Sequence, residues 1–191
     1  MKYPILEYDE TREAFIEPSK VIKPRGIPEK VVICFFQEVI DKIAEGQNAK
    51  MLVENKWEDG PHPVYEIEYQ GERLAFYHPG IGSSLSASLL EEVIAFGGRQ
   101  FIACGGCGVL EKDIAVGNLI VVSGAIRDEG ASYHYLPPSR EVIAQKEVVG
   151  VFEKTLKERD MPYRMGKTWT TDAPYRETPA RIANRREEGC I

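Results

Sequence analysis

Apolar residues along this chain follow two patterns that are both typical of strands. The continuous apolar run VVICFF at 31–36 predicts a buried strand, whereas residues 64–69 and 73–78 alternate apolar and polar positions as half-buried strands do. The dipeptide Gln70-Gly71 between the last two predicts a tight antiparallel hairpin. Further strands are predicted at 51–54, 100–104, 119–123 and 163–171.

Amphipathic helices are predicted between these strands. After Gly82, the residues Leu85, Leu89 and Val93 fall on one helical face, and the helix should end at Gly97. Three further helices are expected: one that ends near Gly46, one that Ser139 caps and that reaches about Arg159, and one that begins at Thr178-Pro179.

The order of these elements predicts the fold class. The strands form a meander in the first half and alternate with helices in the second, so we expect an α/β protein with a mixed central β-sheet flanked by helices. Residues 1–30 carry four prolines and little periodicity, which predicts an irregular N-terminal arm. Residues 31–191 are predicted to form a single domain.

Composition narrows the class of protein. With 43% hydrophobic and 28% charged residues, the 191-residue chain is typical of a globular protein. Its net charge of −6 argues against a nucleic-acid partner, and no apolar run is long enough to span a bilayer. Four scattered cysteines do not form a disulfide framework, and the acidic N-terminus does not fit a signal peptide, so we expect a cytoplasmic location.

A first stretch that could carry chemistry is Gly80-Ile81-Gly82-Ser83-Ser84. It joins a predicted strand to a predicted helix, where backbone N–H groups and hydroxyls can bind an anion such as phosphate. The same residues also fit an ordinary capped strand-to-helix turn. The third glycine of the dinucleotide-binding fingerprint is absent.

A second stretch is Cys104-Gly105-Gly106-Cys107-Gly108, after the next predicted strand. The spacing C-x-x-C occurs in redox pairs and in zinc sites, but no second pair completes four ligands, so we expect no metal. Small thiols in a crowded glycine turn are the preferred interpretation. The glycines would let a ligand approach the backbone.

Two polar segments follow later strands, at positions where loops often carry function. In the segment that begins at Arg127, His134 could act as an acid or base, although a single histidine is more often structural or interfacial.

The segment 170–177 combines hydroxyls, a carboxylate, a ring and a guanidinium. Stacking on Tyr175 with hydrogen bonds from Arg176 would suit a heterocycle; alternatively, Asp172 and Arg176 pair with each other.

Taken together, GIGSSLSASLLEE, FIACGGCGVL, IAVGNLIVVSGAIRDEGASYHYLPP and TTDAPY resemble the nucleoside phosphorylase family, most closely its uridine phosphorylase-like branch. The similar pieces cover about residues 64–191. The resemblance implies a three-layer-like fold with a mixed central sheet surrounded by helices. It also implies a homo-oligomer, a dimer or a ring of dimers, with active sites near subunit interfaces.

Members of this family transfer the ribosyl group of a nucleoside, uridine-like or purine, to phosphate and release the base. The resemblance implies phosphate as co-substrate, with no metal or other cofactor. By similarity, Gly80, Gly82, Ser83, Ser84, Gly105 and Gly106 would line phosphate and ribose, Thr171, Asp172, Tyr175 and Arg176 would contact the base, and Arg127 and His134 would lie in an interface or substrate loop.

Three positions depart from the family pattern. Ala103 stands where the phosphorylases have an arginine, Gly106 where they have a hydroxyl residue, and Leu85 where they have a serine. Because alanine cannot bind phosphate, and hydrolytic relatives that lack this arginine use water, a phosphate-independent nucleosidase is an alternative. The family's ribose-binding Met-Glu segment would follow Ile191, so a truncated, non-catalytic homologue that binds a nucleoside or a partner subunit is another.

Overall fold

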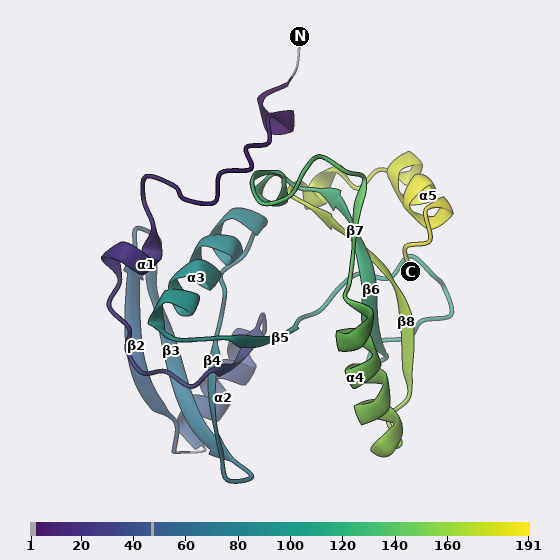
Figure 1. The fold of residues 1–191 in the computed structure, drawn as a ribbon. Helices are drawn as coiled ribbons and strands as arrows, with labels where there is room; N and C mark the ends of the chain where they lie inside the picture. The colour runs from purple at the N-terminus through teal and green to yellow at the C-terminus, as the bar shows by residue number, and fades with distance from the viewer. Residues whose placement is uncertain (1–2, 47) are drawn as a thin grey trace. The chain divides into compact units, whose positions relative to one another are not determined.

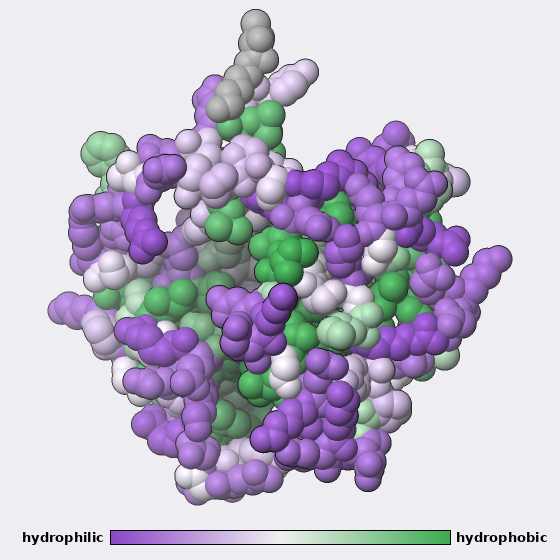
Figure 2. Space-filling view, turned by 45° about the vertical axis from the view of Figure 1, so that its right-hand side comes forward, coloured by the Kyte–Doolittle hydropathy of each residue, from purple (hydrophilic) through white to green (hydrophobic). Residues whose placement is uncertain are grey.

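The computed structural model of the chain describes residues 3–46 and 48–191. The chain divides into two compact units. One unit is Glu10–Cys107, and the second unit combines the residues up to Asp9 with Gly108–Ile191. Hydrophilic side chains cover much of the face shown in Figure 2, with apolar patches between them. Within the described ranges, no helix has the length and apolar character that crossing a membrane requires.

The Glu10–Cys107 unit contains a five-stranded sheet in the order β2-β3-β4-β1-β5 (Figure 1). The meander β2-β3-β4 is antiparallel, and β1 lies parallel to both β4 and β5, so the sheet is mixed as expected. The elements are α1 (Pro18–Val21), β1 (Lys30–Cys34), α2 (Gln37–Gly46), β2 (Lys50–Trp57), β3 (Gly60–Tyr69), β4 (Glu72–Tyr77), α3 (Ser83–Phe96) and β5 (Gln100–Cys104).

Helices cover both faces of this sheet. On one face, Leu89 and Val93 of α3 pack with Ala75 and Tyr77 of β4 in one buried cluster. On the other face, the intervening Phe76 packs with Ile40 of α2 and with Cys34. Successive β4 side chains therefore enter opposite cores. The prediction of a half-buried strand at 73–78 is wrong in this respect, because Ala75, Phe76 and Tyr77 are all buried under helices on the two faces.

Tyr77 combines burial with an unpaired hydroxyl. Its side chain is 1% exposed, its hydroxyl has no hydrogen-bond partner among the residues described, and burial raises its pKa. Because an unpaired buried polar group costs about 1–3 kcal/mol, we expect Tyr77→Phe to raise the free energy of unfolding by about 1 kcal/mol in urea titrations. Tyr65→Phe, at a half-buried site, serves as the control. A loss of stability in Tyr77→Phe would show that the hydroxyl is hydrogen-bonded.

The second unit contains a three-stranded sheet in the order β7-β6-β8. The central strand β6 pairs antiparallel with β7 and parallel with β8, and α4 lies beside β6 (Figure 1). The elements are β6 (Leu119–Asp128), β7 (Glu141–Ile143), α4 (Lys146–Glu158), β8 (Tyr163–Thr171) and α5 (Pro179–Glu187), with 3-10 turns η1 (Pro4–Leu6), η2 (Ala131–His134) and η3 (Pro174–Arg176).

The predicted start of a helix at Ser139 is wrong. The Ser139 hydroxyl donates to the Glu141 carbonyl at 2.9 Å and accepts a hydrogen bond from Arg127 at 2.7 Å, so it does not cap a helix. The β-branched pair Val142-Ile143 then adds β7 to the sheet, and α4 starts only at Lys146.

The predicted start of the last helix is confirmed. The Thr178 side chain accepts a hydrogen bond from the Arg181 backbone N–H, and Pro179 occupies the first helical position.

Candidate functional site

Both predicted glycine turns of the Glu10–Cys107 unit lie at one edge of its sheet. Gly80 follows β4, Gly105 and Gly106 follow β5, and β1 runs between these strands and parallel to both. The carboxyl ends of all three strands therefore meet at the same edge. Open α/β sheets bind ligands at this kind of edge.

The first turn has a backbone that favours glycine. Gly80 has φ of 74° and Gly82 has φ of 96°, in the left-handed region where side chains are strained. A Cβ at Gly80 would also lie 2.6 Å from Cγ of Leu85, which packs against the turn. Ser83 begins α3 directly after Gly82, so the sequence prediction of a turn into a helix is confirmed.

A cavity of about 350 Å³ adjoins this turn. Its volume falls within the range of small-molecule sites, roughly 300–1,000 Å³. None of the described residues around it is a lysine or arginine. The lining residues come from α2, the β2–β3 turn, the start of β3, the segment after β4 and the start of α3: Gln37, Ile40, Asp59, Pro61, His62, Pro63, His78, Gly80, Ile81 and Leu85.

Two histidines give the cavity its polar character. The Gly80 N–H donates to Nδ1 of His78 at 3.0 Å, so neutral His78 carries its proton on Nε2 and has an N–H left to donate. Nε2 of His62 lies 3.1 and 3.2 Å from the two carboxylate oxygens of Asp59. The hydrogen bond with His62 lowers the pKa of Asp59, which keeps this carboxylate ionised. The cavity thus presents a donor and an acceptor between apolar walls.

Aromatic rings fill the space beside the second turn. A Cβ at Gly105 would lie 3.2 Å from the side chain of Phe35, and one at Gly106 would lie 3.4 Å from Phe36. Phe35 also meets the ring of His78 edge-on, with centroids 6.2 Å apart. Phe35 therefore lies between the two turns and offers an apolar ring surface rather than a charged group.

The thiol of Cys104, at the end of β5, has a raised pKa. Burial, with the neighbouring Cys34 thiol, raises its pKa from 9.0 to about 11. Under reducing conditions we expect its alkylation rate by iodoacetamide to rise about ninefold from pH 9 to pH 10, because only the thiolate reacts; an ordinary thiol would gain about twofold. Peptide mass spectrometry measures the rate. A plateau near pH 9 would contradict the shift.

In the second unit, Arg127 is a buried organising residue. Its side chain is 6% exposed and donates to Ser132 Oγ at 2.8 Å, to Ser139 Oγ at 2.7 Å and to the Pro137 carbonyl at 2.8 Å. Its guanidinium also stacks on the Tyr133 ring, 4.2 Å from the centroid. These contacts hold the segment after β6 in place.

The predicted base-contacting residues follow β8 in the same unit. Thr171 pairs in register with Asp128 of β6, and the carboxylate of Asp172 accepts a hydrogen bond from the Gly130 backbone at 2.8 Å. This segment and the one after β6 therefore meet at one end of the parallel pair. Tyr175 is 99% exposed, and Arg176 and His134 are also exposed.

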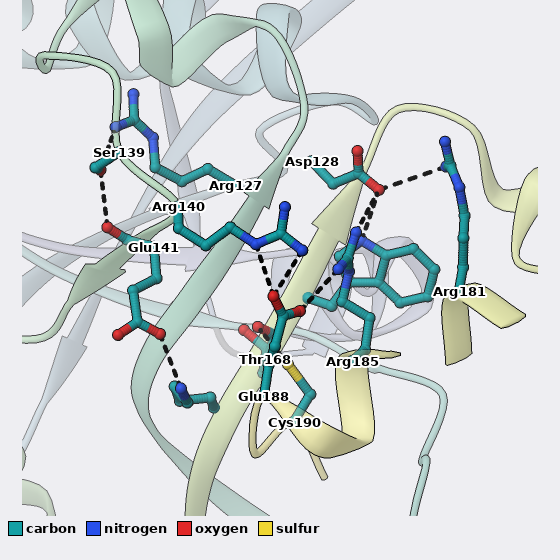
Figure 3. Close-up of polar contacts among 12 residues, drawn as sticks. Arg127, Asp128, Ser139, Arg140, Glu141, Thr168, Arg181, Arg185, Glu188 and Cys190 are labelled. Atoms are coloured by element: carbon teal, nitrogen blue, oxygen red, sulfur yellow. Dashed lines mark hydrogen bonds and ion pairs between the residues drawn. The ribbon is translucent and has the colours of Figure 1, made fainter. Parts of the chain in front are cut away.

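A polar network around Asp128 was not predicted from the sequence (Figure 3). One carboxylate oxygen accepts from Trp169 Nε1 at 3.0 Å and lies 3.4 and 3.5 Å from the guanidiniums of Arg185 and Arg181. Arg185, only 7% exposed, also stacks on Trp169 at 5.0 Å and donates to Glu188 at 2.7 Å. The network attaches α5 to the sheet. Arg181 and Arg185 lie one helical turn apart and therefore on the same face of α5, and this spacing was the sequence feature that pointed to the network.

The predicted site residues fall into the two units as follows: Gly80, Gly82, Ser83, Ser84, Gly105 and Gly106 belong to Glu10–Cys107, and Arg127, His134, Thr171, Asp172, Tyr175 and Arg176 belong to the other. Sequence reasoning missed the cavity residues His78, His62 and Asp59. His78 stands at the end of a predicted strand, which was a usable signal. Across the described residues, no group of His, Cys, Asp and Glu side chains could hold a metal ion.

Comparison with known proteins gives consistent matches. The sequence model of the Phosphorylase superfamily matches residues 29–191. A guanosine phosphorylase of Halorubrum lacusprofundi is 28% identical over 167 residues, which cover 85% of this chain and 66% of that protein. A uridine phosphorylase of Thermococcus kodakarensis is 31% identical over 108 residues, 56% of this chain and 39% of that protein. The chain thus spans less than two thirds of the length of these relatives.

Solved structures show the same fold. A uridine phosphorylase of Vibrio fischeri in complex with 6-hydroxy-1-naphthoic acid matches with a TM-score of 0.75 and 23% identity, covering 87% of this chain and 69% of that one. A purine nucleoside phosphorylase of Toxoplasma gondii in complex with immucillin-H matches with a TM-score of 0.73 and 20% identity, covering 86% and 66%. The expected α/β fold class is confirmed.

Proposed function

This chain belongs to the phosphorylase superfamily, and on that premise we propose that it binds a nucleoside, cleaves the bond between base and ribose, and transfers the ribosyl group to phosphate. The observation that carries the proposal is the cavity at the Gly80 turn. It adjoins the carboxyl edge of a parallel sheet segment, where this architecture binds ligands.

The cavity's side chains suit an uncharged, hydroxyl-rich ligand. The Nε2–H of His78 can donate to a ribose or base oxygen, and the ionised carboxylate of Asp59 can accept from a hydroxyl. Cleavage also builds positive charge on the sugar in the transition state, and a carboxylate close to that charge lowers its energy. Ile40 and Leu85 supply apolar contact.

One observation favours water as a second candidate acceptor. No lysine or arginine is among the described residues that line the cavity, and Asp59 adds negative charge there. A phosphate ion is usually held by cationic side chains, whereas water needs none. A phosphate-independent nucleosidase is therefore the alternative. A non-catalytic, nucleoside-binding homologue remains the outcome if neither acceptor supports turnover.

The remaining sequence expectations belong to the same proposal. We propose the turns at Gly80–Ser84 and Gly105–Gly106 as the ribose and phosphate side, and the segment 171–176 as contacts to the base. Arg127 would order the loop that carries His134, as its hydrogen bonds to that loop support. Phosphate would be the co-substrate without any cofactor, and the protein would act as a cytoplasmic homo-oligomer.

Filling the cavity from its rim tests the proposed site. Ile81 lines the cavity and is largely exposed, so Ile81→Trp should block the space without disturbing the core. We expect calorimetric affinity for uridine or guanosine to fall about tenfold or more, roughly 1.4 kcal/mol. Val21→Trp, at an exposed apolar residue on α1 outside the cavity, is the matched control and should bind as the unmodified protein does. Equal affinities in both variants would place nucleoside binding elsewhere.

A further inference from the structure

Two cysteines occupy directly paired positions on neighbouring strands. Cys34 is the last residue of β1 and Cys104 the last residue of β5, and the two are register partners in a parallel pair. Neighbouring strands lie about 4.8 Å apart, and paired residues point to the same face of the sheet. This separation falls within the Cα–Cα range of disulfides, about 4.4–6.8 Å.

The two thiols differ in accessibility. Both are free; Cys34 is 5% exposed and its thiol donates to the Phe36 carbonyl at 3.8 Å, whereas Cys104 is exposed. An incoming reagent therefore reaches Cys104 first, and Cys34 lies behind it as the resolving thiol. The raised pKa of Cys104 makes its thiolate scarce at neutral pH, so the first step is slow.

We propose that Cys34 and Cys104 form a modification site, a thiol pair that a low-molecular-weight disulfide such as oxidised glutathione converts to an inter-strand disulfide. The Cys104 thiolate attacks one glutathione sulfur and releases one glutathione thiolate. Cys34 then loses its proton, attacks the Cys104 sulfur of the mixed disulfide and releases the second glutathione. Two protein thiols are oxidised, one glutathione disulfide is reduced, and the two protein protons end on the glutathione thiols.

Cys107 is the competing partner. It is exposed and lies three residues after Cys104, beyond the end of β5, so it has no register partner in the sheet. A Cys34–Cys104 bond would join the ends of β1 and β5, beside Phe35 and Gly105. A Cys104–Cys107 bond would leave the two strands unlinked, and the products are therefore separable by peptide mapping.

To test the proposal, the full chain is incubated with oxidised glutathione and digested without reduction, and its disulfide-linked peptides are identified by mass spectrometry. We expect a linked Cys34–Cys104 peptide, lighter than the two reduced peptides by two hydrogen atoms, in the unmodified protein and in Cys107→Ser. In Cys34→Ala combined with Cys107→Ser the reaction should stop at glutathionylated Cys104. Because Cys34 is buried, circular dichroism should first establish that this variant is folded, and Cys34→Val is the substitute if it is not. A Cys104–Cys107 product alone, or no linked peptide in Cys107→Ser, overturns the proposal.

Discussion

Replacing Gly80 with alanine is expected to lower the free energy of unfolding by about 3 kcal/mol. About 1 kcal/mol comes from placing a side chain at a positive φ of 74°, and the remainder from overlap with Leu85, whose Cγ would lie 2.6 Å from the new Cβ. Urea unfolding followed by circular dichroism measures the change.

The matched control is Gly82→Ala in the same turn. Gly82 also has a positive φ, 96°, but a Cβ there meets nothing within 4 Å, so we expect a loss of only about 1 kcal/mol. The double variant Gly80→Ala with Leu85→Ala should be less destabilised than the sum of its two single variants by about 2 kcal/mol, since the overlap disappears. Equal losses in the two glycine variants would contradict the packing of Leu85 on the turn.

Asp128→Ala is expected to destabilise the second unit by about 3 kcal/mol. The substitution removes the acceptor for Trp169 Nε1 and one partner of the buried guanidinium of Arg185, leaving both less satisfied. Arg185 already has a buried Nε with no partner in the described part of the chain. Other groups therefore cannot readily replace the hydrogen bond that Arg185 loses with Asp128. Thermal and urea unfolding measure the loss.

An exposed ion pair provides the comparison. Glu111→Ala removes the partner of Arg186, whose Nε lies 3.4 Å from the carboxylate at the surface, and should cost less than about 0.5 kcal/mol. Adding Arg185→Met to Asp128→Ala should restore about 1 kcal/mol, because the poorly paired buried charge is removed while the side chain still covers Trp169. If Asp128→Ala cost no more than Glu111→Ala, the network would not hold α5.

Local sequence patterns predicted most elements of the fold. The turn at Gln70-Gly71, the helix after Gly82 and the cap at Thr178 depend on neighbouring residues, and each lies where its pattern placed it. The helix predicted from Ser139 was wrong because long-range contacts override the local pattern. Arg127 donates a hydrogen bond to the Ser139 hydroxyl, and the residues that follow pair with β6 as strand β7.

The candidate site was only partly predictable for the same physical reason. The glycine turns were predictable because glycines that directly follow a strand are a local sequence signal. The cavity was not predictable, because Asp59 of the β2–β3 turn and His62 of β3 meet His78 only through the pairing of β3 with β4. Likewise, Asp128 and Arg185 are distant in sequence and meet through the docking of α5.

The most direct test of the central claim is base release from uridine and guanosine by the full chain, in buffers with and without phosphate. The proposed function predicts time-dependent release of free base that Ile81→Trp reduces and Val21→Trp does not. Ribose 1-phosphate as the other product would identify phosphate as the acceptor, and free ribose without phosphate would identify water. Absence of base release in both buffers, from protein that binds the nucleoside, would contradict catalysis by this chain.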